Sequence, residues 1–351
     1  MREPGAGADR EAKIQRFPWA TFWGRLIVVG LGGLLFLWAF RPLEARPKRE
    51  ITLITRSVPL SLADSELARV GDLRFLGGAW LSSADEGFGG LSGLTLEESG
   101  NVLGLLAVTD QGELLRAEVV LADKEPPQWR AAAIEPLLGE GGKPVLGKSF
   151  SDAESIARLP DGRFLVGFER RHRLWAYGPG LRGPARIFET PPALRESPSN
   201  GGLESVATWP DGRVLAISEG LKTASGNLAA FLFQSGNWSS LEWTPSGAHF
   251  EPADATVLPD GDLLLLERSF LAGAPIALSS RIVRVKAAMV RPGARLQGRV
   301  IAELKAPLVA ENFEGIATFR NQEGRLRIAL VSDDNFSSLQ RTLLLWFELV
   351  E

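Results

Sequence analysis

Five segments of the chain repeat one pattern, and this repeat constrains the fold more than any other feature of the sequence. Each copy has a short polar or acidic residue, three or four small or apolar residues, a turn, an apolar run and a second acid. The copies span residues 90–112, 152–171, 202–220, 251–269 and 312–334. Three of the turns are Pro-Asp-Gly, which predicts a hairpin because Pro sets φ and Gly accepts a positive φ.

The spacing of the copies indicates a β-propeller. Their first polar or acidic residues are separated by 62, 50, 50 and 60 residues and are Ser92, Glu154, Glu204, Asp254 and Glu314. Repeats of this length made of short strands are typical of propeller blades. At about 50 residues a blade, the body predicts an all-β, six-bladed propeller over residues 71–351. The sixth blade would join residues 73–81 to 343–349, which closes the ring and covers the sheet edges.

The segments outside the repeat are assigned by composition. Residues 41–70 are expected to form a linker and a first strand region. Two further segments, 122–150 and 185–201, are rich in Pro and Gly and are expected to be loops. The short apolar runs 173–177, 228–233 and 282–285 are expected to be outer strands.

Composition excludes several classes of function. The chain has no Cys and only two His, so a thiol nucleophile, a Cys-ligated metal and a three-His metal site are all excluded. Residues 1–50 contain nine Lys or Arg and five Asp or Glu, whereas the rest contains 30 basic and 37 acidic residues. An acidic body is a poor partner for nucleic acid, because phosphate contacts need clustered Lys and Arg.

The N-terminus contains a membrane signal. Residues 26–40 are uncharged and apolar, follow the basic region 1–25, and are flanked by Arg25 and Arg41. The run is short for a spanning helix, which needs about 20 apolar residues, so an uncleaved signal anchor and a cleaved signal peptide both remain open, with a buried helix as the least favoured alternative. Both main interpretations export the body, and we expect a periplasmic protein tethered to the bacterial inner membrane or released after cleavage.

The repeated acids predict a metal site at one end of the channel. Glu154, Glu204, Asp254 and Glu314 begin copies of the repeat, and Asp333 belongs to a second set of acids that follows the second strand of each copy. Clustered carboxylates repel one another, and a hard cation relieves the repulsion. An oxygen-rich, His-poor site favours Ca²⁺, with Mg²⁺ less favoured. The alternative is that each acid caps a turn or binds backbone N–H groups in its own blade.

A second group of charged residues predicts anion binding. Residues 168–173 read Phe-Glu-Arg-Arg-His-Arg. On a strand, Glu169 would face one way with Arg171 and Arg173, and Arg170 with His172 would face the other. Arg binds phosphate or carboxylate through a bidentate fork, and His172 and Glu169 are candidates for acid–base roles. Arg268 and Arg341 accompany acids in later copies. The alternative is surface charge with local salt bridges.

The repeat resembles a known bacterial family, the phytase-like proteins or "esterase-like activity of phytase". The resemblance lies in GGLSGL, DAESIARLPDGRFLVGFERRHRLWAYG, NGGLESVATWPDGRVLAISEG, EPADATVLPDGDLLLLERSF and NFEGIATFR with VSDDNFSSLQRTLLLWF. It covers roughly residues 70–350, and the stretches FER-x-H-R, NFEGIA and SDDNF occur together and in order. The resemblance implies an exported β-propeller that hydrolyses an ester or phosphoester with a divalent metal.

Two hypotheses of function follow. In the first, the protein is a metal-dependent hydrolase of small anionic phosphate or carboxylic esters. Its acids hold Ca²⁺, Arg170, Arg171 and Arg173 bind the anionic group, and Glu169 or His172 assists a water. In the second, it is a non-catalytic binding or scaffold propeller tethered to the membrane. A metal-free, lactonase-like propeller is a minor third alternative.

Overall fold

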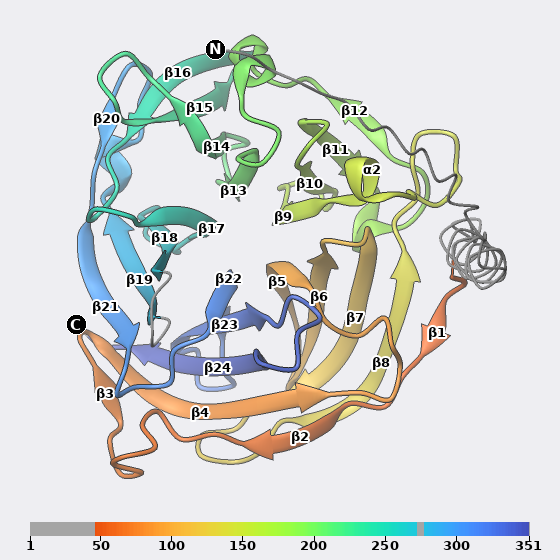
Figure 1. Cartoon of the computed structure of the whole chain (residues 1–351), viewed down its shortest axis with the longest axis vertical. Helices are drawn as coiled ribbons and strands as arrows, with labels where there is room; N and C mark the ends of the chain where they lie inside the picture. Colours follow the sequence, from red (N-terminus) through yellow and green to blue (C-terminus); the bar gives the residue numbers. More distant parts are fainter. Residues whose placement is uncertain (1–45, 272–276, 351) are drawn as a thin grey trace, which may run out of the picture. The chain divides into compact units, whose positions relative to one another are not determined.

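Five β-sheets surround a central channel in the computed structural model, which describes residues 46–271 and 277–350 (Figure 1). The basic region 1–25 and the apolar run 26–40 lie outside the described residues. Among the described residues, no helix is long and apolar enough to span a membrane. The prediction of an all-β propeller is confirmed.

The first two blades come from consecutive stretches of chain. From the channel outwards, blade 1 contains β5 (Leu91–Ser99), β6 (Val102–Thr109), β7 (Glu113–Val120), β8 (Gln128–Pro136) and β1 (Arg49–Glu50). Blade 2 contains β9 (Ala153–Arg158), β10 (Phe164–Phe168), β11 (Arg173–Tyr177) and β12 (Arg186–Phe188). The helix α2 (Lys148–Ser151) lies between these blades in the chain.

The remaining blades follow the same plan, with strands from both ends of the body in the last one. Blade 3 contains β13 (Leu203–Thr208), β14 (Val214–Lys222), β15 (Leu228–Gln234), β16 (Asn237–Trp243) and β20 (Arg295–Leu296). Blade 4 contains β17 (Glu251–Val257), β18 (Leu263–Leu271), β19 (Ala277–Val285) and β21 (Arg299–Lys305). Blade 5 contains β22 (Asn312–Arg320), β23 (Leu326–Asp333), β24 (Thr342–Leu349), β4 (Leu73–Ser82) and β2 (Ile54–Ser57), with β3 (Arg69–Val70) paired to β4.

The expectation of six blades is wrong for the described residues, which form five. The two ends of the body do pair as expected, because Leu343 of β24 is opposite Trp80 of β4. These strands extend the sheet of the fifth repeat instead of forming a separate blade. The ring closes because the inner strand β22 packs against β5.

The segments expected to be loops are partly strands. Residues 122–150 contain β8, and residues 185–201 contain β12. β8 gives a weak strand pattern because small Ala residues occupy its centre and several of its side chains are exposed. The expected outer strand 173–177 matches β11, and the other two lie within β15 and β19.

The hairpin turns form as their sequence predicts. Gly162, Gly212 and Gly261 all have φ near +87°, the left-handed conformation that glycine accepts. In each turn the Asp side chain accepts a hydrogen bond from the backbone N–H two residues later. Apolar cores fill the spaces between neighbouring blades and hold buried side chains such as Trp243 and Trp346. Burying each such side chain contributes about 2 kcal/mol, so the cores hold the inner strands around the channel.

Candidate functional site

A β-bulge occurs at the same position in the inner strand of every blade. In blade 2, Ser155 pairs with Gly167 and Ala153 with Phe168, so Glu154 between them has no partner. The unpaired residue of each blade belongs to what we call the bulge ring: Ser92, Glu154, Glu204, Ala253 and Glu314. A bulge bends its strand and redirects the extra side chain. The bulge lies near the start of each inner strand and the hairpin turn follows its end, so the bulge ring lies at the end of the channel opposite the Pro-Asp-Gly turns.

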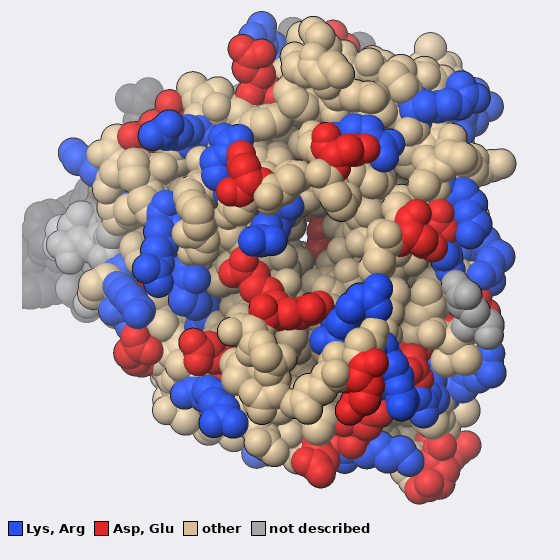
Figure 2. Space-filling model, turned by 180° about the vertical axis from the view of Figure 1, so that it is seen from behind, with Lys and Arg blue, Asp and Glu red and all other residues tan. Residues whose placement is uncertain are grey.

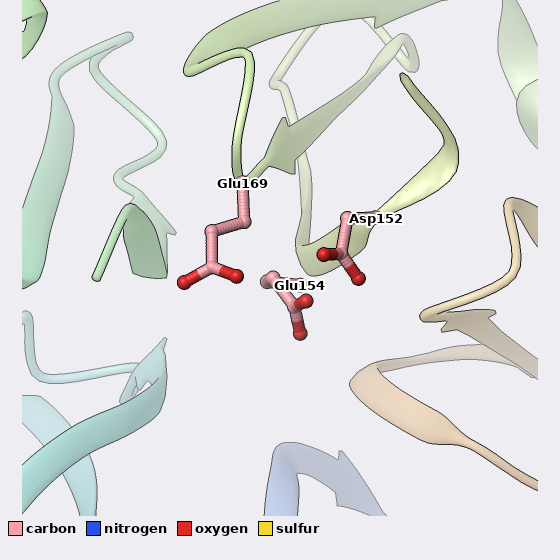
Figure 3. Close-up of side chains that lie close together, drawn as sticks. All are labelled: Asp152, Glu154 and Glu169. Atoms are coloured by element: carbon pink, nitrogen blue, oxygen red, sulfur yellow. The ribbon is translucent and has the colours of Figure 1, made fainter. Parts of the chain in front are cut away.

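Three acids of blade 2 form the first carboxylate group. Oxygen atoms of Asp152, Glu154 and Glu169 all lie within 4.8 Å of one another. Asp152 and Glu169 are buried, and Glu154 is partly exposed. The three side chains come from the start of β9 and the end of β10, and their carboxylates lie together in the middle of the ring of strands (Figure 3).

Glu169 also belongs to a second carboxylate group, which joins blades 2 and 3. Oxygen atoms of Glu169, Glu204 and Glu219 lie within 4.8 Å of one another. The backbone N–H of Gly201 donates a hydrogen bond to Glu169 Oε1, which holds this carboxylate against blade 3. Glu169 therefore connects two groups of acids into one site.

Burial raises the pKa of several of these acids. The pKa of Glu154 lies well above its ordinary value because of burial, and the charges of Glu314 and Asp152 raise it further. Burial also raises the pKa of Glu204, with a contribution from the charge of Glu154. The pKa of Glu219 is raised to about 7 by burial, although the charge of Arg268 opposes the shift. The cluster therefore favours either bound protons or a bound cation.

Arg268 supplies a positive charge on the other side of the channel. Its Nη1 donates to Glu314 Oε1 at 2.5 Å and to Asn312 Oδ1 at 3.0 Å, and its Nη2 lies 3.4 Å from Glu219 Oε1. Burial lowers the pKa of this guanidinium, but the carboxylates around it more than offset the effect, so the net pKa is raised. Its buried Nε–H has no hydrogen-bond acceptor among the described residues. Arg268 is thus charged and has one donor to spare.

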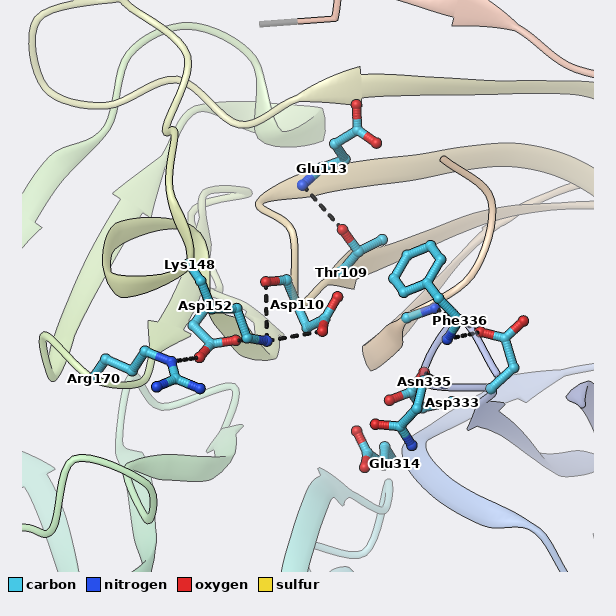
Figure 4. A network of polar contacts seen from close by, with 12 residues as sticks. Thr109, Asp110, Glu113, Lys148, Asp152, Arg170, Glu314, Asp333, Asn335 and Phe336 are labelled. Carbon is cyan, nitrogen blue, oxygen red and sulfur yellow. Dashed lines mark hydrogen bonds and ion pairs between the residues drawn. The ribbon is translucent and has the colours of Figure 1, made fainter. Parts of the chain in front are cut away.

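Lys148 joins the site to blade 1. Its Nζ lies 2.8 Å from Asp110 Oδ2 and 2.5 Å from Asp152 Oδ1 (Figure 4). Burial lowers the pKa of Lys148, but hydrogen bonds to the two acids raise it overall. Arg170 Nε donates to the other oxygen of Asp152 at 2.5 Å. Figure 2 shows one face of the molecule, with a hollow at its centre where acidic and basic side chains lie next to one another.

Asp333 lies at the edge of the site, at the end of β23. Its Oδ1 accepts a hydrogen bond from Asn335 N at 2.6 Å. Burial, with the charge of Glu314, raises its pKa to about 8. Asp333 belongs to neither of the two carboxylate groups.

The structure separates Asp254 from the other predicted ligands. Its Oδ1 accepts from Ala255 N and its Oδ2 from Ile316 N of the next blade, both at 2.8 Å. Asp254 lies five positions before the Pro of its turn, whereas Glu154 and Glu204 lie six positions before theirs. Ala253 therefore occupies the bulge position, and Asp254 corresponds to Ser155, which also bonds to the next blade.

The strand alternation expected for residues 169–173 is wrong, because residues 169–172 form a turn. Arg170 has a φ of +56°, and its side chain reaches Asp152 near Glu169. Arg171 stacks on the ring of Phe150 at 3.6 Å.

The other predicted polar residues have contacts of their own. Arg173 lies over Phe168 and Trp175, and burial lowers its pKa to about 10. His172 Nε2 is 2.9 Å from Pro198 O. Arg341 pairs with Glu311 at 2.7 Å, away from both carboxylate groups.

Sequence reasoning missed Asp152 and Lys148. Asp152 lies two residues before the bulge, at a position where the other copies have no shared acid, and its carboxylate pairs with Lys148 of α2. The sequence pattern that could have identified Asp152 is the pair of acids in Ser151-Asp152-Ala153-Glu154, which resembles a pair of metal ligands at the start of a strand.

Comparison with solved structures finds distant likenesses to this chain. The catalytic domain of an α-L-arabinofuranosidase from Coprinopsis cinerea is 13% identical, with 84% of this chain and 96% of that chain covered and a TM-score of 0.47. A gluconolactonase from Xanthomonas campestris is 11% identical, with 88% and 99% covered and a TM-score of 0.38. Likeness at this level carries no information on activity. A search of the curated proteins finds no match.

The sequence itself identifies the family. Residues 86–336 match the family described as "Phytase-like: Esterase-like activity of phytase". This range begins just before β5 and ends after β23, and it includes every residue of the two carboxylate groups. The expected resemblance is confirmed, and the chain belongs to the phytase-like family.

Proposed function

We propose that the protein is a divalent-cation-dependent hydrolase of phosphate or carboxylic esters, with Ca²⁺ as the preferred cation. The observation that carries the proposal is the pair of carboxylate groups that share Glu169. Membership of the phytase-like family is consistent with it.

The donor atoms fit a hard cation. All the side chains in the two groups offer carboxylate oxygens, which Ca²⁺ and Mg²⁺ prefer. Within the described part of the chain, no backbone or side-chain N–H donates a hydrogen bond to Glu154 or Glu204. Burial without donors disfavours ionised carboxylates, so a cation would stabilise them. Glu154, Glu169 and Glu204 would hold it, with Asp152 and Glu219 beside them.

A bound cation would polarise the ester oxygen and favour deprotonation of a water. The chain's own residues supply the remaining functions. Arg268 has a free, buried Nε–H donor and would orient the anionic group of the substrate. Glu219, with a pKa of about 7, would accept the proton of the attacking water, and the ester bond would break with a proton returned to the leaving oxygen. In this scheme Glu219 takes the role that sequence analysis predicts for Glu169 or His172.

Calorimetric titration of the purified chain with Ca²⁺ after chelator treatment tests the proposal. Glu154→Gln and Glu204→Gln should each weaken binding, whereas Glu323→Gln, in an exposed turn, should not. Hydrolysis of a panel of phosphate and carboxylic esters should then depend on the cation and be lost in Glu219→Gln. Absence of binding at millimolar Ca²⁺ and Mg²⁺ would reject the metal site. Binding without turnover of any ester would favour the non-catalytic binding propeller.

We also propose that the propeller works outside the cytoplasm, tethered to the inner membrane by residues 26–40. The support is the uncharged apolar run with Arg25 before it and Arg41 after it. Protease added to intact spheroplasts should digest the propeller and leave a cytoplasmic control protein intact. A propeller that is protected until the cells are lysed would contradict export.

A further inference from the structure

Phe336 is an exposed aromatic side chain at the edge of the candidate site. It follows β23 in the segment Asp333-Asp334-Asn335-Phe336, and 39% of its surface is exposed. Asn335 and Phe336 both have positive φ, at +49° and +50°. A bulky residue rarely adopts this left-handed conformation, because its Cβ approaches the backbone too closely.

The ring of Phe336 lies where blades 1 and 5 meet the acids of the site (Figure 4). A Cβ added to Gly90 would lie 2.5 Å from both the Phe336 ring and Asp110 Oδ1. The ring, Gly90 and Asp110 thus come together at one point. Asp110 forms an ion pair with Lys148, which also forms an ion pair with Asp152 of the first carboxylate group. The ring is therefore connected to the first carboxylate group through Asp110 and Lys148.

A specific backbone cradle holds Phe336 in this conformation. Asp334 Oδ1 accepts hydrogen bonds from Phe336 N and from Gly90 N, each at 3.1 Å. A Cβ at Gly89 would lie only 2.6 Å from the same Asp334 oxygen. The two glycines therefore allow Asp334 to fix the loop. Strain of this kind costs free energy, and an exposed ring recovers little of it through burial.

The charges near the ring restrict what could bind against it. Lys148 is paired with Asp110 and Asp152, and Arg170 is paired with Asp152. A ligand with many anionic groups needs clustered basic residues, and these cations are already neutralised by acids. A ligand with one anionic group and one apolar group fits these charges better.

We propose that Phe336 is a stacking platform for a flat apolar group of the substrate, which makes aryl esters with a single anionic group the preferred substrate class. This inference rests on the proposed ester hydrolysis and adds the substrate class to it. Aromatic rings stack in offset or edge-on arrangements, and such contacts favour an aryl group over an alkyl group of similar size.

Two measurements test the platform, both with the full chain and Ca²⁺. The first is calorimetric binding of phenylphosphonate and methylphosphonate, which are not hydrolysed. The second is steady-state hydrolysis of phenyl phosphate and ethyl phosphate, with KM and kcat determined separately. We expect Phe336→Ala to weaken phenylphosphonate binding and to raise KM for phenyl phosphate, each by about tenfold. Methylphosphonate binding and kcat should be unchanged.

Two further variants separate stacking from a structural role. Leu339→Ala, at a side chain that is 90% exposed three residues away, should change neither ligand preference. Phe336→Gly removes the ring and accepts the left-handed conformation, so its melting temperature should not fall below that of the wild type. Loss of aryl preference in Phe336→Gly without loss of stability supports the platform.

The outcomes are distinguishable. Phenylphosphonate binding that depends on Phe336, without turnover of either ester, would reject the proposed hydrolysis and keep the platform. No preference for phenylphosphonate in the wild type, or a preference that survives in Phe336→Ala and Phe336→Gly, would overturn the platform, even if esters are hydrolysed.

Discussion

Arg268 and Glu314 form an ion pair across two blades, with Arg268 Nη1 2.5 Å from Glu314 Oε1. Arg268 comes from β18, and Glu314 is the bulged residue of β22. The same guanidinium reaches Glu219 of blade 3. One cation is therefore shared by three blades, and it offsets the negative charges of Glu314 and Glu219.

Replacement of Arg268 by Gln should destabilise the protein in a pH-dependent way. Removal of one partner from a largely buried ion pair costs about 3 kcal/mol, because the remaining charge is left uncompensated. The loss should be larger at pH 8 than at pH 5, since protonation of Glu314 and Glu219 at low pH removes the unpaired charge. Urea unfolding at both pH values measures this loss of stability.

Arg295→Gln is the control. It breaks an exposed ion pair with Glu242 and should have almost no effect on stability. An equal loss at both pH values would show that the charge of Arg268 is not the cause.

Stability of the cation-free protein should fall as the pH rises from about 4 to about 8. The pKa values of Glu219 and Asp333 are raised to about 7 and about 8 in the folded state, against about 4 in the unfolded chain. The folded protein therefore binds more protons than the unfolded chain in this window, and deprotonation favours unfolding. The total effect is on the order of a few kcal/mol.

Ca²⁺ should reverse this pH dependence, because a cation binds the ionised carboxylates and binds more tightly as the pH rises. Melting temperatures between pH 5 and pH 9, in chelator and in Ca²⁺, provide the measurement. A flat profile in chelator would contradict the raised pKa values. The same slope in both buffers would contradict cation binding at these acids.

Local features of the fold could be predicted from the sequence, and long-range ones could not. The Pro-Asp-Gly turns, the inner hairpins and the strand 173–177 follow from turn chemistry and short apolar runs. Blade number depends on which sheet the terminal strands join, and no local pattern encodes that choice. The prediction of strand alternation at 169–173 was wrong, because Arg170 is left-handed and the chain turns at 169–172.

The candidate site could be predicted in outline, since Glu154, Glu169 and Glu204 were identified as acids of the repeat. The acidity and spacing of Asp254 predict a ligand, but its distance from the following Pro places it one residue after the bulge. A shift of one residue in a strand directs the side chain to the opposite face. Counted back from the Pro of each turn, the copies place Ala253, and not Asp254, at the position of Glu154 and Glu204.

Asp254→Asn should therefore reduce stability without changing cation binding. Asp254 accepts hydrogen bonds from Ala255 N and Ile316 N on separate oxygens. The amide of Asn can accept only one of them, and the other N–H is left buried without a partner, at a cost of about 2 kcal/mol. Chemical unfolding and Ca²⁺ calorimetry test both parts, with the exposed Glu125→Gln as the control. A weaker Ca²⁺ affinity in folded Asp254→Asn would indicate that Asp254 is a ligand and would contradict this prediction.

Ser92→Asp should strengthen cation binding. Ser92 is the member of the bulge ring in blade 1, and its inner strand β5 packs against β9 and β22, which carry Glu154 and Glu314. The hydroxyl of Ser92 is buried and has no hydrogen-bond partner among the described residues. A carboxylate at this position adds one more negative oxygen ligand toward the same channel, so Ca²⁺ affinity at pH 8 should rise by about tenfold. The cation-free variant should be less stable than the wild type, because another like charge joins the cluster.

Ser92→Asn is the control, because Asn has nearly the same size as Asp and no charge. This variant should leave the Ca²⁺ affinity unchanged. If Ser92→Asp and Ser92→Asn bind Ca²⁺ equally well, the bulge does not direct this side chain toward the cation, and the five equivalent positions do not act as one ring.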